Sequence, residues 1–131
     1  MDRLRRFHRD RSGNIAIVAA LGAIPLVLAI GIALDYARAS SAKTDLQEAI
    51  DAAVLAGARD ATTTWATVAS QMLTSSIKTR DFTLTSSSFV QYSSGNYVGT
   101  AAGTVATTFA GLVSVQTIQI GATATAVVKA A

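Results

Sequence analysis

The sequence predicts an α+β protein in which a long N-terminal helix, first transmembrane and then a spine, packs on a small antiparallel β-sheet. Three observations support this fold class. Residues 15–34 carry no charged or hydrogen-bonding side chain, and the chain after Asp35 has no glycine or proline before Gly57. From residue 81 onward, apolar and polar residues alternate with a period of two. A helix that precedes a run of strands is typical of α+β proteins.

The apolar segment 15–34 is the length of a transmembrane helix. Twenty helical residues at about 1.5 Å each span about 30 Å, the thickness of the hydrocarbon core of a bilayer. Pro25 lies near the middle of the segment. It removes one backbone donor and leaves a carbonyl one turn earlier unpaired, so we expect a kink there.

Basic residues precede the apolar segment. Residues 1–14 hold five arginines against two aspartates, a net charge of +3, whereas six basic and six acidic groups cancel in residues 35–131. Flanking positive charge stays on the cytoplasmic side of a membrane. We therefore expect 1–14 to be a cytoplasmic tail and the C-terminal part to be extracytoplasmic. The residues that set this topology are Arg3, Arg5, Arg6, Arg9 and Arg11.

A cleaved signal peptide is the alternative to a retained anchor. It would need an apolar core of about 7–15 residues followed by a small-x-small site. Ala37-Arg38-Ala39 could serve as that site, which would release a small secreted β-rich protein after Ala39. The apolar core is longer than this, however, and charges lie on both sides of the site. A retained anchor is favoured.

Residues 35–58 predict an amphipathic continuation of the same helix, rich in good helix formers. Apolar positions recur at steps of three and four, and we expect this spine face to pack on the rest of the protein. The carboxylates of Asp45, Glu48 and Asp51 lie mostly off this face and predict a solvated surface. The expected packing face comprises Tyr36, Leu46, Ile50, Ala53 and Gly57, with Ala39 and the stem of Lys43 between them.

Residues 59–131 predict a small extracytoplasmic domain with a short helix at 65–78 and about three antiparallel strands. Ser93 to Asn96 have turn chemistry, and residues 109–113 could form one helical turn. A disulfide-free sheet of this size is marginal alone, so its apolar face needs the spine as a cover. The expected inward sets are Phe82, Leu84, Val90 and Tyr92; Tyr97, Ala101, Val105 and Phe109; and Ile118, Ile120, Ala122, Ala124, Ala126 and Val128.

The chain lacks the residues that catalysis and cofactor binding usually need. It has no cysteine, and its one histidine, His8, lies in the basic tail. There is no phosphate-binding glycine motif and no carboxylate cluster with metal-ligand spacing. We expect no catalytic, cofactor-binding or metal-binding residues and no cofactor, and therefore a non-enzyme. Nucleic-acid binding is not expected, because no aromatic residues or basic helix face accompany the arginines.

Several segments together resemble a known family. They are Arg9-Asp10-Arg11-Ser12-Gly13-Asn14-Ile15-Ala16, Asp35-Tyr36-Ala37-Arg38 after the apolar span, and Leu46-Gln47-Glu48-Ala49-Ile50-Asp51-Ala52-Ala53-Val54-Leu55-Ala56-Gly57-Ala58, with a C-terminal likeness at 108–112 and 118–126. This order resembles the TadE/TadG-like proteins of bacterial tight-adherence (Flp) pilus systems. The resemblance implies a minor pilin or pseudopilin with a pilin-like fold, anchored in the inner membrane. Its expected partners are membrane lipid, other pilin-like subunits and pilus assembly components.

The resemblance also implies a processing site. Pilin-like proteins that a prepilin peptidase cuts are cleaved after a glycine, which corresponds here to Gly13 and would leave Asn14 first. Such substrates usually carry a glutamate five residues into the mature chain, where this sequence has Val18. This difference favours the TadG-like branch. The alternative to a pilus subunit is a single-pass envelope protein with a partner-binding outer domain and no filament role.

Overall fold

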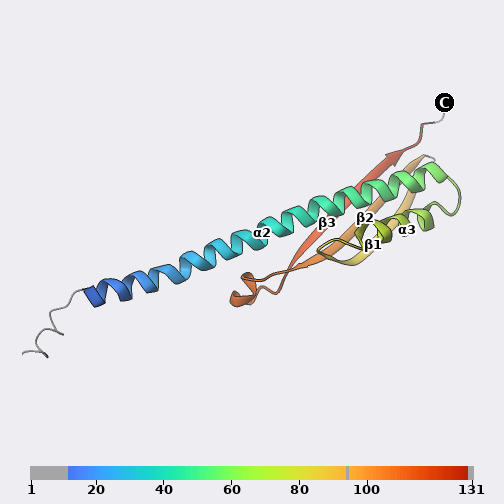
Figure 1. The fold of residues 1–131 in the computed structure, drawn as a ribbon. Coiled ribbons are helices and arrows are strands. Elements are labelled where there is room, and N and C mark those ends of the chain that lie inside the picture. Colours follow the sequence, from blue (N-terminus) through green and yellow to red (C-terminus); the bar gives the residue numbers. More distant parts are fainter. Residues whose placement is uncertain (1–11, 94, 130–131) are drawn as a thin grey trace, which may run out of the picture.

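The computed structural model describes residues 12–93 and 95–129. Its longest element is helix α2, Ser12–Asp60, whose 49 residues extend over about 74 Å. The helix continues through Pro25 and runs from the apolar segment into the spine without interruption (Figure 1). It ends where Ala61 takes a left-handed backbone conformation (φ 47°) and donates its N–H to the Gly57 carbonyl at 3.1 Å.

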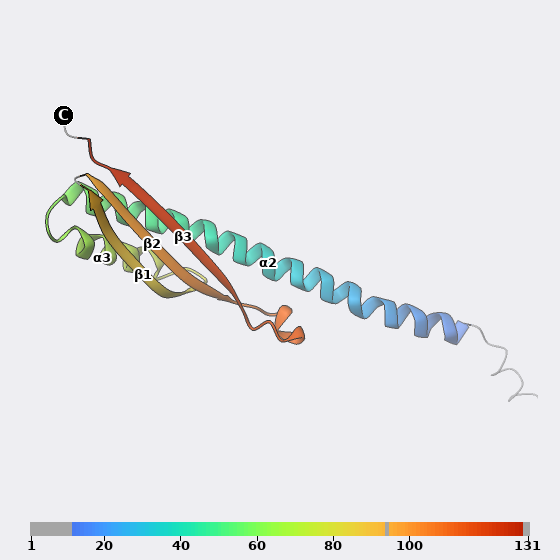
Figure 2. The ribbon, with the colours of Figure 1, turned by 180° about the vertical axis from the view of Figure 1, so that it is seen from behind.

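The remaining elements gather along the C-terminal half of α2. Helix α3, Trp65–Ile77, turns back beside α2, and strands β1 (Thr83–Ser93) and β2 (Asn96–Ala106) follow as a hairpin. A short 3-10 helix, η1 (Ala110–Val113), precedes β3 (Thr117–Val127). The three strands form one antiparallel sheet in the order β1-β2-β3 (Figure 2). The predicted fold class, α+β with a long N-terminal helix on a small sheet, is confirmed.

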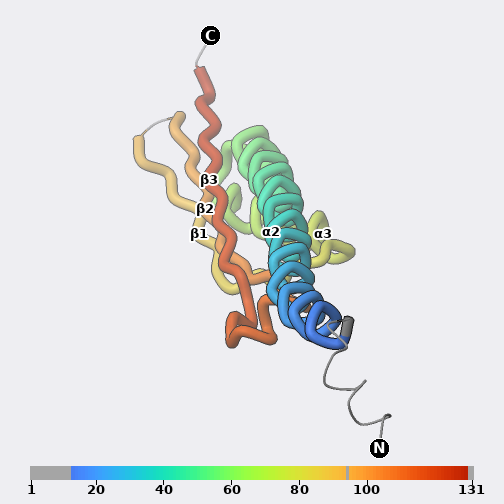
Figure 3. Tube along the Cα trace, turned by 90° about the vertical axis from the view of Figure 1, so that its left-hand side faces the viewer, coloured from blue at the N-terminus to red at the C-terminus, as the bar shows by residue number. Residues whose placement is uncertain are grey.

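The domain consists of two layers, with α2 and α3 on one face of the sheet and no helix from the described residues on the other (Figure 3). Burial alternates along the two strands nearest α2: Tyr97, Ala101 and Val105 of β2 are buried, as are Ile120 and Ala122 of β3. The residues that alternate with the buried positions face outward, and several of them are threonines, Thr100 and Thr104 in β2 and Thr123 and Thr125 in β3. This alternation is the one predicted for a sheet with one wet face.

Strand β1 differs from the prediction. We expected Phe82, Leu84, Val90 and Tyr92 to share the inward face, but Val90 and Tyr92 are exposed, and Phe89 packs against the core instead. The register with β2 shifts between Leu84 and Ser86, where one residue of β1 has no partner. Because side chains alternate with a period of two, this irregularity exchanges the two faces of the strand beyond it.

The core lies between α2, α3 and the sheet. Its largest fully buried side chains are Leu46, Ile50, Val54 and Leu73. The only tryptophan, Trp65, is also buried, and its ring meets those of Phe89 and Tyr97 edge-on at centroid distances of 6.2 and 4.9 Å. The Trp65 side chain therefore belongs to the core.

Two glycines allow the layers to approach closely. A Cβ added to Gly99 in β2 would overlap the side chain of Val54 in α2. A Cβ at Gly57 would lie 2.7 Å from the backbone oxygen of Trp65. With a larger residue at Gly99 the sheet could not pack this closely on α2, and with a larger residue at Gly57 neither could α3. The spine helix is therefore part of the domain core.

Candidate membrane and assembly surface

The N-terminal part of α2 has little contact with the rest of the protein. Residues 13–27 are exposed on every side of the helix, including its large aliphatic side chains. Within the part of the chain that the structure describes, α2 is the one helix long and apolar enough to cross a membrane, judged by length and composition. An exposed rod of this kind is unfavourable in water and requires lipid or other apolar helices around it.

The residues expected to govern processing and topology lie at or before the start of this rod. Gly13 and Asn14 are in the first turn of α2, exposed, and a Cβ at Gly13 would meet nothing within 4 Å. The five arginines Arg3, Arg5, Arg6, Arg9 and Arg11 lie outside the described residues. The kink expected at Pro25 stays a prediction; α2 keeps its helical assignment there.

The packing face of the spine differs at two residues from the expected set. Ala39, Leu46, Ile50, Ala53 and Gly57 are buried, but Tyr36 is 71% exposed and Lys43 is exposed as well. The assignment of these two residues to the packing face is therefore wrong. Successive residues of a helix are separated by about 100° around its axis, and the buried line runs through the residue before each of them, Asp35 and Ala42.

Asp35 was not anticipated as a site residue. It is only 2% exposed, and its carboxylate accepts hydrogen bonds from three successive backbone N–H groups of the β2–β3 connection. The donors are Thr108 at 3.0 Å, Phe109 at 2.7 Å and Ala110 at 2.7 Å, which lie at the start of η1. Charge-assisted bonds of this kind are stronger than neutral ones. Asp35 therefore ties the spine to a loop 73 to 75 residues later in the chain.

The hydrogen bonds also keep Asp35 ionised. The Ala110 N–H, together with those of Thr108 and Phe109 and the nearby positive charge of Arg38, holds the pKa of Asp35 below its ordinary value of 3.8. Burial alone would raise the pKa of Asp35, but the hydrogen bonds and the positive charge outweigh it. Because the group lies immediately after the apolar segment 15–34, it places a fixed negative charge where the expected span meets the outer domain.

Two neighbours complete this attachment. Arg38 donates from Nη1 to the Thr108 hydroxyl at 3.2 Å. One turn before Asp35, Gly31 is buried under the ring of Phe109, which a Cβ at that position would overlap. We name Gly31, Asp35, Arg38, Thr108 and Phe109 the clasp.

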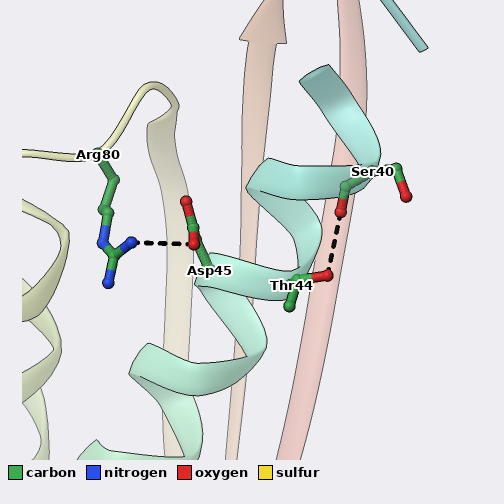
Figure 4. Close-up of polar contacts among 4 residues, drawn as sticks. All are labelled: Ser40, Thr44, Asp45 and Arg80. Carbon is green, nitrogen blue, oxygen red and sulfur yellow. Dashed lines mark hydrogen bonds and ion pairs between the residues drawn. The ribbon is translucent and has the colours of Figure 1, made fainter. Parts of the chain in front are cut away.

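The carboxylates farther along the spine make structural contacts. Asp45 forms an ion pair with Arg80 at 2.9 Å (Figure 4). On the other side of the helix, the Thr44 hydroxyl donates to the Ser40 carbonyl at 3.2 Å. Gln47 donates from Nε2 to Asp51 and to the Thr123 carbonyl of β3, both at 2.9 Å. Across residues 12–93 and 95–129 no three metal-ligating side chains come together. Asp45 and Gln47 thus attach the spine to its neighbours, whereas Asp51 is paired within the helix.

The comparison with known families bears on the same helix. Residues 13–60 match the family described as "Putative Flp pilus-assembly TadE/G-like", and this segment is α2 without its first residue. No curated protein and no solved structure matches the chain. The resemblance predicted from the sequence is thus confirmed over the helix that carries both the apolar rod and the packing face. Residues 13–60 of this chain are therefore similar to the TadE/G-like pilus-assembly family, and the match covers α2 alone.

Proposed function

We propose that this protein is a membrane-anchored minor pilin or pseudopilin-like structural subunit that takes part in assembly of a Tad/Flp-type pilus. The observation that carries the proposal is the division of one continuous helix into an exposed apolar half and a half built into a folded domain. The family match over 13–60 supports it. The role is structural, as in the matched family type, and no catalytic step is assigned to the chain.

In this proposal, residues 1–14 stay in the cytoplasm, 15–34 cross the inner membrane, and 35–58 continue as the spine of the extracytoplasmic domain 59–131. The same apolar rod that lipid surrounds in the membrane can pack against like helices in a filament. Small residues four apart allow close helix approach. The chain has such pairs at Ala19/Ala23 and Ala29/Ala33.

Intact mass of the protein from membrane fractions tests the processing step. Loss of residues 1–13 would show cleavage after Gly13, the event expected of a prepilin peptidase substrate. The variant Gly13→Val should then remain full length, whereas Gly22→Val should be processed normally. Both positions have open space around the added side chain, so folding is not the cause of a difference. Loss of residues 1–39 would instead show secretion and would contradict the anchored subunit.

Orientation is tested by cysteine labelling in intact cells. The chain has no cysteine of its own, so a single introduced cysteine is the one site of reaction. Tyr92→Cys, at an exposed position of the sheet, should react with a membrane-impermeant maleimide. Reversing the charges of Arg3, Arg5 and Arg6 should reduce that labelling by disturbing the topology. Unchanged labelling would contradict the flanking-charge argument.

Assembly is tested by cross-linking in cells that produce the pilus. Cross-links from the exposed faces of the rod to other pilin-like subunits, and loss of piliation on deletion of the gene, are the expected results. A correctly oriented protein that forms no such cross-links and whose loss leaves piliation intact would favour the single-pass envelope protein with a partner-binding domain.

A further inference from the structure

The connection between β2 and β3 presents an apolar tip. Leu112, Val113 and Val115 are 72%, 49% and 46% exposed, respectively. The loop has a defined conformation, because the backbone N–H and the hydroxyl of Thr107 both donate to the Gln116 carbonyl at 3.0 Å. Three aliphatic side chains are thus held on the surface of a closed loop, with no covering group among the described residues.

The clasp sets the height of this loop along α2. Phe109 packs on Gly31, which precedes the end of the expected span 15–34 by three residues, or about 4.5 Å of helix. Asp35 binds the backbone at the start of η1, so the loop cannot move away from the helix without losing three hydrogen bonds. Figures 1 and 2 show η1 beside α2, nearer to the apolar end than the sheet is. A bilayer that covers residues 15–34 therefore reaches the loop.

The chemistry of the loop suits the boundary between headgroups and acyl chains. No charged residue occurs anywhere in 82–128, so the loop itself carries no side-chain charge into the bilayer, and the Asp35 carboxylate beside it is already buried and hydrogen-bonded within the protein. Most of its backbone N–H groups are paired, either within the loop or with Asp35. Leu112 N–H donates to the Phe109 carbonyl at 3.0 Å, and Val115 N–H donates to the Ala110 carbonyl at 3.0 Å. Internal pairing of this kind is what an apolar solvent demands of a backbone.

We propose that residues 109–115 insert into the outer leaflet and form a second lipid contact of the protein, beside the transmembrane helix. The apolar tip contacts lipid at the boundary between the headgroups and the acyl chains of the bilayer. Amphipathic elements at membrane surfaces lie about 5–10 Å deep in this region, which agrees with the level set by Gly31. The proposal rests on the membrane span of the proposed function and adds that the outer domain itself touches lipid.

Depth-dependent quenching tests the contact in the full chain, reconstituted in phosphatidylcholine vesicles that contain spin-labelled lipid. Leu112→Cys carries an environment-sensitive fluorophore. Two matched controls carry the same label at positions of similar exposure: Leu21→Cys inside the expected span and Val127→Cys at the far end of β3. We expect a blue-shifted emission at position 112 and lipid quenching several-fold greater than at position 127. The emission of Trp65 verifies that each variant is folded, and Val115→Cys repeats the measurement at a second tip position.

The outcomes separate this inference from the anchor. Quenching at position 21 without quenching at positions 112 and 115 overturns the loop insertion and leaves the span intact. Absence of quenching at all three positions overturns both. A blue shift at position 112 that is insensitive to lipid quencher, and that disappears on dilution below one chain per vesicle, would show that a second copy covers the tip. That result also overturns the lipid contact.

Discussion

Replacing Leu46 by alanine should destabilise the outer domain strongly, because this side chain is fully buried in the cluster that joins α2 to the sheet. Truncation of a buried leucine costs about 2–5 kcal/mol, the lost burial plus the cavity left behind. Leu55→Ala is the matched control. It makes the same chemical change on the same helix at a side chain that is 49% exposed, and it should cost less than about 1 kcal/mol. Alanine favours helix at both positions, so helix propensity does not separate them.

Urea unfolding of the full chain in vesicles measures the difference. A loss of about 3 kcal/mol, with a denaturant slope of about 2 kcal/mol per molar, lowers the midpoint by about 1.5 M. Trp65 is the natural probe, since it is the only tryptophan and its ring packs against Phe89 and Tyr97 in the core. Its emission should shift to the red as the outer domain opens.

The comparison has a clear refuting result. Equal midpoints for Leu46→Ala and Leu55→Ala would mean that the sheet folds without the spine as its cover. A smaller midpoint shift for Leu46→Ala, accompanied by a reduced denaturant slope, would indicate a change in the unfolded ensemble, and the free energy would then be compared by thermal unfolding.

Three further predictions concern the clasp and the spine. Asp35→Asn should lower the unfolding midpoint at neutral pH. Because the folded-state pKa of Asp35 is lowered, the ionised carboxylate contributes fully to folding stability above the ordinary pKa of 3.8, and this contribution is lost as the pH falls through the folded-state pKa. The unfolding midpoints of wild type and variant should therefore converge in acid. A difference in midpoint that persists at low pH would contradict this account. Gly31→Val should displace the Phe109 ring that packs on Gly31 and increase the rate at which a cysteine at position 112 reacts with a maleimide. Gly22→Val, where the added side chain meets open space, should leave that rate unchanged. Arg80→Ala should cost less than about 1 kcal/mol by the same unfolding assay, because its ion pair with Asp45 is solvent-exposed; a larger loss would point to a role beyond that pair.

The elements were predictable because their periodicities are long and uninterrupted. The spine was expected over about 15–58 and the second helix over 65–78, close to Ser12–Asp60 and Trp65–Ile77. The helical turn after β2 was also anticipated, and η1 occupies Ala110–Val113. In each case local spacing and turn residues were sufficient, because tertiary contacts act in the same direction as the local preferences.

The wrong predictions concern residues whose orientation or role is determined by a tertiary contact rather than by local sequence. The irregularity between Leu84 and Ser86 leaves no mark in a run of serines and threonines, so the exchange of faces in β1 could not be deduced. Tyr36 has the amphipathic character of a packing residue, but the helical phase is fixed by where the sheet touches α2. Asp35 acquires its role from backbone groups of a distant loop. Its sequence signals were its position directly after the apolar segment and its place in the Asp35-Tyr36-Ala37-Arg38 segment of the family resemblance, and neither of them indicates its partner.

The unbroken helix has a mechanical consequence. An α-helix is stiff in torsion and in bending over the length of α2, and its far half is fused to the sheet through a close-packed core. Any turn of the apolar half about its own axis must therefore swing the sheet through the same angle, and any inclination of the rod must incline the sheet with it. Neighbouring molecules that contact only the apolar half of α2 can therefore determine which face of the sheet points outward. They need no contact with the sheet itself.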